Sequence, residues 1–197
     1  PHARRRQEAG AHPRRRRLEG ARPRPGGETA AGGYAYIHSA VDHHSRLAYS
    51  EVLGDEQAET AVGFWRRAQA WFAEQGVAVQ AVLTDTGSAY RSSAFARLCS
   101  EAGVRHRFTR PYRPQTNGKV ERFNRTLLKE WAYVRVYRSG RARTEALTRW
   151  LHQYNHRRRH TALGGFPPRQ PRHQPPGSVQ LARLRSEAFH IRIGFGD

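Results

Sequence analysis

Apolar residues are spaced along the first half of the chain in patterns that predict a β-hairpin followed by a helix. Residues 34–41 and 47–53 are rich in aromatic and aliphatic side chains, and the polar stretch 43–46 between them predicts the turn. Residues 56–75 then have helical spacing and are followed by Gly76. We expect the apolar face of this helix to be core, with Ala61, Phe64, Trp65, Ala68, Trp71 and Phe72 pointing inward.

The second half alternates between short apolar runs and helical patterns. Residues 77–84 predict a buried strand that ends at Asp85, and 104–108 predict a weaker one. Three helices are expected here. The first is capped by Ser92 or Ser93 and ends before Gly103, and the last spans 144–155. The middle one is capped by Thr116 or Asn117, and its inward face carries Val120, Phe123, Leu127, Leu128 and Trp131. This order predicts an α/β domain with a mixed sheet, in which Asp85 lies at a strand's carboxyl end, where sites form.

Three segments differ in composition. Residues 1–33 contain nine Arg and three Glu and hardly any large apolar side chain, so we expect them to be disordered, with a basic DNA-contacting arm as the alternative. Residues 34–168 have the periodic apolar patterns described above and are interpreted as one folded domain. Residues 169–197 are Pro-rich and then weakly patterned, and are interpreted as a C-terminal tail.

The charge of the chain points to a polyanionic partner. The formal net charge is +19, and all but Lys119 and Lys129 of the 35 Lys and Arg residues are Arg. Nucleic acid is the simplest partner for such a chain, and GC-rich coding is the alternative source of the Arg excess.

Cys99 is the only cysteine, which excludes a disulfide framework and a thiol-based zinc site. No apolar run reaches the length of a membrane span, so we expect a cytoplasmic, nucleoid-associated protein. The absence of Met indicates a fragment or a non-ATG start.

Two carboxylates, Asp85 and Glu121, are the candidate catalytic and metal-binding residues. Phosphodiester cleavage and strand transfer use two Mg²⁺ or Mn²⁺ ions held by carboxylates, and a strand-end Asp with an adjustable helical Glu suits that task. Taken alone, Asp85-Thr86-Gly87 is also an ordinary turn, and Glu121 with Arg125 is also an ordinary surface ion pair.

Three longer motifs resemble one family. They are Asp85-Thr86-Gly87-Ser88, the segment 109–122 that reads TRPYRPQTNGKVER, and the segment 154–164 that reads YNHRRRHTALG. These resemble the catalytic core of insertion-sequence transposases, which belong with retroviral integrases in the DDE superfamily. The resemblance implies a ribonuclease-H-like fold over about 34–168, with Asp85 as the second catalytic carboxylate, Glu121 as the third, and a two-metal site of Mg²⁺ or Mn²⁺. It also implies transposon-end and target DNA as partners, and multimers.

The family's first aspartate is absent from the expected place. Residues 11–33 contain no Asp, and the first in the chain, Asp42, is interpreted as a turn residue bonding its own backbone, with metal ligation as the alternative. The adjacent His43 and His44 are expected to face solvent. We hypothesise that residues 1–33 are an out-of-frame reading of a transposase gene. The sheet would then lack its first, central strand, and strand transfer would be lost.

DNA contacts are expected around Glu121. Basic, amide and aromatic side chains there suit phosphate positioning and stacking. The candidates are Arg110, Tyr112, Arg113, Gln115, Asn117, Lys119, Arg122 and Arg125. For the basic run 157–160, packing and DNA contact remain equal alternatives. The leading interpretation is thus a truncated or decayed transposase core, ahead of a non-enzymatic DNA-binding remnant and an unrelated basic structural protein.

Overall fold

The computed structural model describes residues 35–109, 118–169 and 177–185. The predicted hairpin is confirmed as β1 (Tyr36–Asp42) and β2 (Ala48–Leu53), and the long helix after it as α1 (Ala58–Glu74). β3 (Val79–Thr84), α2 (Ser93–Glu101) and β4 (Arg105–Phe108) follow in the expected order, with the Ser92 side chain accepting from Phe95 N at the start of α2.

The last helices differ in detail from the predicted ones. α3 (Gly118–Leu127) continues into η2, a π-helical turn at Leu128–Ala132, and α4 (Gly140–His156) begins four residues before the expected start at Thr144. The Ser139 side chain caps α4 by accepting from Ala142 N, which is the signal for this earlier start. A short 3₁₀ turn, η3 (Thr161–Leu163), and the strand β5 (Gly177–Arg185) complete the described chain.

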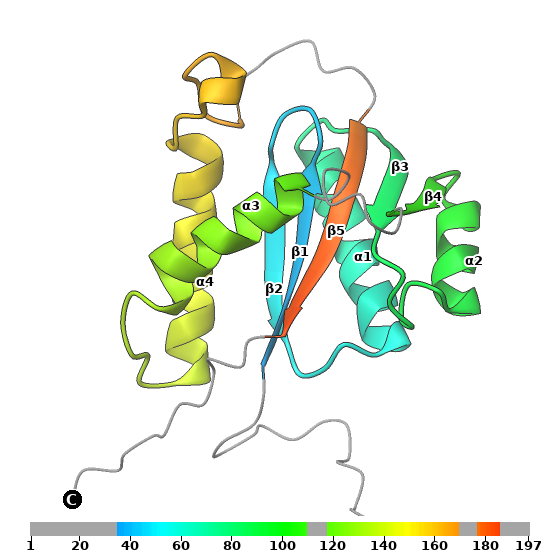
Figure 1. Ribbon diagram of the computed structural model, residues 1–197, viewed down its shortest axis with the longest axis horizontal. Helices are drawn as coiled ribbons and strands as arrows, with labels where there is room; N and C mark the ends of the chain where they lie inside the picture. The colour runs from blue at the N-terminus through cyan, green and yellow to red at the C-terminus, as the bar shows by residue number, and fades with distance from the viewer. Residues whose placement is uncertain (1–34, 110–117, 170–176, 186–197) are drawn as a thin grey trace, which may run out of the picture.

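The five strands form one mixed sheet in the order β2-β1-β5-β3-β4 (Figure 1). β1 is antiparallel to both β2 and β5, whereas β3 is parallel to both β5 and β4. β5 therefore takes the middle of the sheet, although it comes last in the described chain. The expectation that the sheet lacks its middle member is wrong, because β5 supplies hydrogen-bonding partners to both neighbouring strands.

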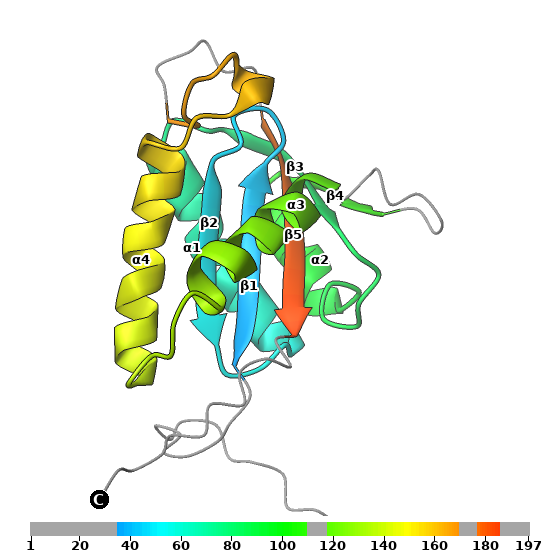
Figure 2. The same cartoon turned by 60° about the vertical axis from the view of Figure 1, so that its left-hand side comes forward.

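Helices cover both faces of the sheet and create two cores. α1 and α2 pack on one face over a core that includes Phe64, Trp65 and Phe95, and Leu181 of β5 contributes to it. α3 crosses β1 and β5 on the other face, beside α4 (Figure 2), where Val120 and Phe123 form a second core. The inward face predicted for α1 is confirmed except at Trp71, which is half-buried.

Candidate active site

Asp85 is the first residue after β3, and its position is fixed from both sides. Its side-chain Oδ1 accepts from Gly87 N at 2.7 Å, which closes a local turn. The Thr84 hydroxyl donates to Asp85 O at 2.9 Å and lies 2.9 Å from His106 Nε2 on β4. Because a hydroxyl has one proton, His106 Nε2 must be the donor in the second contact. Asp85 is thus held, half-buried, at the carboxyl end of the strand, as expected.

Glu121 lies in the first turn of α3 and is exposed. That end of the helix is held over the middle of the sheet, because Val120 N donates to the side chain of Gln180 on β5 at 3.4 Å. Gln180 is only 3% exposed. β5 therefore lies between the two elements that carry the candidate carboxylates: β3 pairs with one edge of it, and the start of α3 packs on its face.

Extended past its last pair, the register of β3 and β5 puts an alanine beside Asp85. Leu83 pairs with Gln180 in the parallel register, and the same register continued for two residues sets Asp85 beside Ala182. Alternation along the strand puts Gln180 and Ala182 on the α3 side, while Val179 and Leu181 belong to the core under α1. Neither of these two α3-facing side chains is a carboxylate. Within the described part of the chain, no three His, Cys, Asp or Glu residues are grouped as metal ligands would be.

Asp42 acts as a turn residue, as the sequence predicted. It is fully buried at the end of β1, and its Oδ2 accepts from Ser45 N at 2.7 Å and from Ser45 Oγ at 2.6 Å. Its register partner on β5 is Val179, which faces the α1 side of the sheet. The strand register thus directs Asp42 to the face opposite Glu121, and it does not substitute for the missing aspartate.

A short polar chain connects the hairpin turn, α3 and β5. Lys119 Nζ donates to His43 O at 3.1 Å and also bonds His43 Nε2, while Gln180 Nε2 lies 3.4 Å from His43 Nδ1. Burial, and then the positive charge of Arg46, lower the pKa of Lys119 to about 8. Burial also lowers the pKa of His43, with Lys119 as the next cause. Both His43 and His44 remain exposed, as expected, but the contact between His43 and Lys119 was not anticipated.

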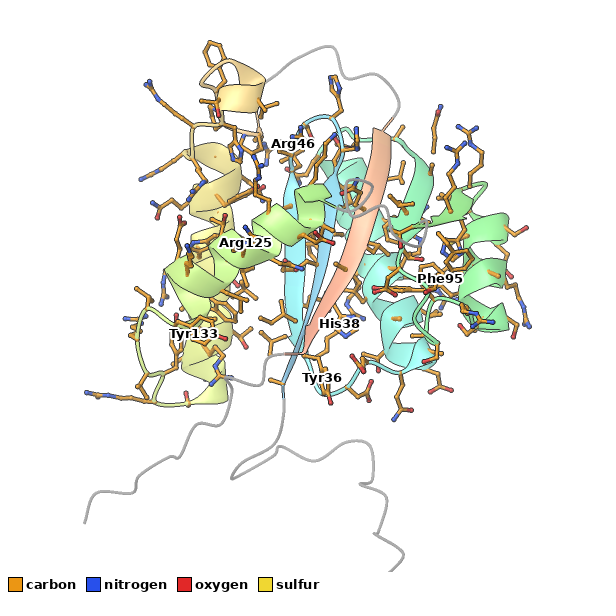
Figure 3. The ribbon with its side chains drawn as sticks, viewed as in Figure 1. Tyr36, His38, Arg46, Phe95, Arg125 and Tyr133 are labelled. Atoms are coloured by element: carbon orange, nitrogen blue, oxygen red, sulfur yellow. The ribbon has the colours of Figure 1, made fainter. Side chains whose placement is uncertain are left out.

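The predicted DNA-contacting residues divide into two sets. Lys119, Arg122 and Arg125 lie on α3, where Arg122 and Arg125 are exposed. Lys119 and Arg122 also line a cavity with Arg46, whereas Arg125 lies farther along the helix (Figure 3). The others fall outside the described residues: Arg110, Tyr112, Arg113, Gln115 and Asn117.

Sequence reasoning missed Gln180, Ala182 and Arg46. The first two belong to the stretch 177–185, where Val179 and Leu181 alternate with other residues, and this short period-two pattern is the signal that could have indicated a strand. Arg46 had no local signal beyond its place in a turn, where its φ of 65° is unusual for a residue other than Gly.

Two models described as "Integrase core domain" match this chain, one over residues 25–114 and the other over 102–168. The chain belongs to the superfamily of retroviral integrases and DDE transposases. A relative is the "Insertion element IS476 uncharacterized 39.2 kDa protein" of Xanthomonas euvesicatoria, which is 30% identical over 134 residues, or 68% of this chain and 34% of the relative. Another is the "Retrovirus-related Pol polyprotein from transposon TNT 1-94" of Nicotiana tabacum, 32% identical over 99 residues, or 50% of this chain and 7% of the polyprotein.

Solved structures agree with this assignment. A chain of the simian T-cell lymphotropic virus intasome, solved with PP2A regulatory subunit B56 gamma, superposes with a TM-score of 0.58 at 25% identity, over 72% of this chain and 51% of that one. The catalytic core domain of BIV integrase gives a TM-score of 0.51 at 25% identity, over 68% of this chain and 82% of that one. The predicted ribonuclease-H-like fold is thereby confirmed. Among the described residues, no helix is long and apolar enough to cross a membrane.

Proposed function

We propose that this chain is an integrase-type core for DNA integration and transposition that binds DNA but has lost strand transfer. The family is metal-dependent and acts on DNA. The finer statements are part of the proposal: the partners are transposon ends and target DNA, the ion is Mg²⁺ or Mn²⁺, and the chain works at the nucleoid in association with other copies. The curated relatives named above are much longer than this chain, which spans 34% or less of each.

The observation that carries the proposed loss is Ala182. Two metal ions that activate the attacking oxygen and stabilise the leaving oxygen need several carboxylates, at least one of them shared between the ions. Asp85 and Glu121 would supply two carboxylates to such a site, but the register of the neighbouring strand puts the methyl group of Ala182 where an oxygen ligand would be needed. The described residues therefore do not fit a two-metal centre, and no catalytic step is assigned to one.

The same observation favours a second candidate function. A non-enzymatic DNA-binding remnant would retain the fold and the basic surface of the family without its chemistry. Both candidates bind DNA and lack strand transfer, and they differ in whether one divalent ion still binds at Asp85. Micromolar Mn²⁺ affinity that is lost in Asp85→Asn would support a surviving metal site. Weak Mn²⁺ binding, with DNA binding unaffected by Asp85→Asn, would support the remnant.

Restoring a carboxylate on β5 tests the proposal. We expect the purified chain to give no joining of its flanking element ends in Mg²⁺ or Mn²⁺. Ala182→Asp should raise Mn²⁺ affinity by at least about tenfold relative to Ala182→Asn, because only the former adds an anionic oxygen beside Asp85. Ala182 is 6% exposed, so both variants bury a polar group and the Asn variant controls for that cost. Mg²⁺-dependent cleavage or joining by the unmodified chain would contradict the proposed loss.

A further inference from the structure

A basic cavity lies between three parts of the chain that are distant in sequence. It has a volume of about 470 Å³ and is bounded by the turn between β1 and β2, the first turns of α3, and the segment that follows α4. Its basic lining residues are Arg46, Lys119, Arg122, Arg158, Arg159 and His160, and no Asp or Glu is among the described residues that line it. Figure 3 shows Arg46 at the end of the hairpin that faces the end of α4.

Most cations of the basic cavity form no ion pair among the described residues, although, against the lowering by burial, the carboxylate of Asp42 acts to raise the pKa of Lys119 and of Arg46. Arg158 forms an ion pair with Glu130 at 2.5 Å, outside the cavity lining. Among the described residues, the ion pairs found do not include Arg46, Lys119, Arg122 or Arg159. Four cations gathered around one cavity repel each other, and an anion placed among them would relieve that repulsion.

Buried polar nitrogens in the cavity wall also lack partners in the part of the chain that the structure describes. Arg46 Nη1 and His160 Nε2 are buried and have no hydrogen-bond partner among the described residues. Such groups are rare in folded proteins because an unpaired buried polar atom costs about 1–3 kcal/mol. A ligand that offers several oxygen acceptors would satisfy the Arg46 donor, and it would also satisfy His160 in the tautomer that carries its proton on Nε2.

The remainder of the lining is suited to a sugar-phosphate unit. The rings of Phe123 and Tyr154 provide apolar surface beside the cations, and Thr126 and Thr161 add hydroxyl groups. The volume lies within the range of about 300–1,000 Å³ that is usual for small-ligand sites, so there is room for more than a phosphate group.

We propose that the basic cavity binds a backbone phosphate of a DNA strand, with Arg46, Arg159 and His160 as binding residues in addition to Lys119 and Arg122. This inference rests on the proposed DNA-binding function and names one site for it. Lys119 and Arg122 flank Glu121 on α3, so the strand bound in the cavity passes within about one helical turn of that carboxylate. A contact of this kind fixes the position of a strand without selecting its sequence.

A charge-matched pair of double variants tests the site. The cavity variant combines Arg46→Gln and Arg159→Gln. The control variant combines Arg66→Gln and Arg97→Gln, whose residues are exposed on α1 and α2 and so lie on the opposite face of the sheet. Binding of a 30-mer DNA is measured by fluorescence anisotropy over a range of salt concentrations. We expect the cavity variant to lose at least about tenfold in affinity and its salt slope to fall by up to about one, since the single phosphate contact proposed here contributes about 0.7–0.9.

The control variant should lose less than about threefold in affinity. Ala162→Glu gives a second variant, because Ala162 is an exposed residue of the lining and its replacement puts an acid there without disturbing the core. Circular dichroism checks that each variant is folded. Equal losses in the cavity and control variants, with no effect of Ala162→Glu, would overturn the inference.

A free phosphate is the other source of the same chemistry, and a separate arm distinguishes it. Inorganic phosphate is titrated into the chain and followed by NMR shifts of the cavity residues. The cavity variant could lose phosphate binding and yet bind DNA as tightly as the unmodified chain. In that case the ligand of the cavity would be a free anion and not a DNA strand, which would overturn the inference. Absence of DNA binding by the unmodified chain would instead refute the proposed function.

Discussion

Helix α3 contributes to two neighbouring regions, the carboxylate region around Asp85, Ala182 and Glu121 and the basic cavity around Arg46. In the carboxylate region a central strand is in place, but the side chain beside Asp85 is a methyl group. In the basic cavity three segments converge with several cations, and the described part of the lining has no carboxylate. On our proposal the fold retains the scaffold for both regions, while only the basic cavity retains side chains that suit its ligand. DNA binding is therefore expected to outlast strand transfer.

Removal of the ring that supports both regions should produce the largest effect. Phe123 of α3 is 2% exposed and packs edge-to-face on Tyr154, with ring centroids 4.9 Å apart. Phe123→Ala should lower the free energy of unfolding by about 3–5 kcal/mol, because it opens a cavity in the second core. Urea denaturation measures the change, and DNA affinity should fall in parallel because α3 is no longer held.

The milder change Phe123→Leu provides the control for this prediction. It retains most of the apolar volume, so both the stability and the DNA affinity should be affected less than in Phe123→Ala. A cost below about 1 kcal/mol for Phe123→Ala would show that α3 is not anchored through this ring and would separate the two regions.

Asn155 provides a way to disturb the basic cavity more than the carboxylate region. This α4 residue is 3% exposed; its Oδ1 accepts from Ala48 N at 2.9 Å, and its Nδ2 donates to Ala48 O at 2.8 Å. The amide thus pairs with the edge strand β2 and holds the end of α4, from which the residues 158–160 of the cavity continue.

Asn155→Ala should cost about 1–3 kcal/mol of stability, because two backbone groups of Ala48 lose their partner. DNA affinity should fall, while Mn²⁺ binding in an Ala182→Asp background should change little. Thermal unfolding and the two binding assays measure these effects. Gln153→Ala, an exposed change on the same helix, is the matched control. Equal losses of both ligands in Asn155→Ala would mean that the two regions do not respond separately.

Local patterns predicted the parts of the fold that depend on neighbouring residues. The helical spacing of Phe64, Trp65 and Ala68, the cap at Ser92 and the turn role of Asp42 each involve residues within a few positions, so each was visible in the sequence. Asp85 was expected at a strand end because an apolar run precedes it, and that position is also confirmed.

Long-range pairings could not be predicted in this way. Gln180 pairs with Val41, which lies far away in the sequence, and the apolar alternation in the stretch 177–185 is short, so the strand has a weak local pattern. The basic cavity combines Arg46, Lys119 and Arg159 from three separate segments, and no spacing rule connects them. The motif 154–164 was recognised as a family signature, but its residues have different roles. Asn155 bonds the edge strand of the sheet and His160 lines the cavity, and only the contacts in the structure reveal this difference.

The smallest expected effect is a pH dependence that distinguishes the basic cavity from a simple basic surface. The pKa of Lys119 is about 8, lowered from its usual value by burial and by Arg46. Lys119 is therefore charged below pH 8 and becomes neutral as the pH rises through it, so its attraction for phosphate is present at pH 7 and largely lost at pH 9. DNA affinity should fall several-fold over that window in anisotropy titrations at constant salt. A bound phosphate favours the charged lysine, which would move the fall to a somewhat higher pH in the complex.

Other groups at the cavity do not account for a change in this window. Burial is the largest cause lowering the pKa of both His43 and His160 from 6.5, so both are neutral throughout the range from pH 7 to 9. Burial also lowers the pKa of Arg46, but the ordinary pKa of a guanidinium lies far above this window. Lys119→Arg should therefore keep the affinity at pH 7 within a few-fold and remove most of the dependence, because the guanidinium stays charged. An unchanged decline in Lys119→Arg would place the titrating group outside the basic cavity, and DNA would then be held by the general positive charge of the surface.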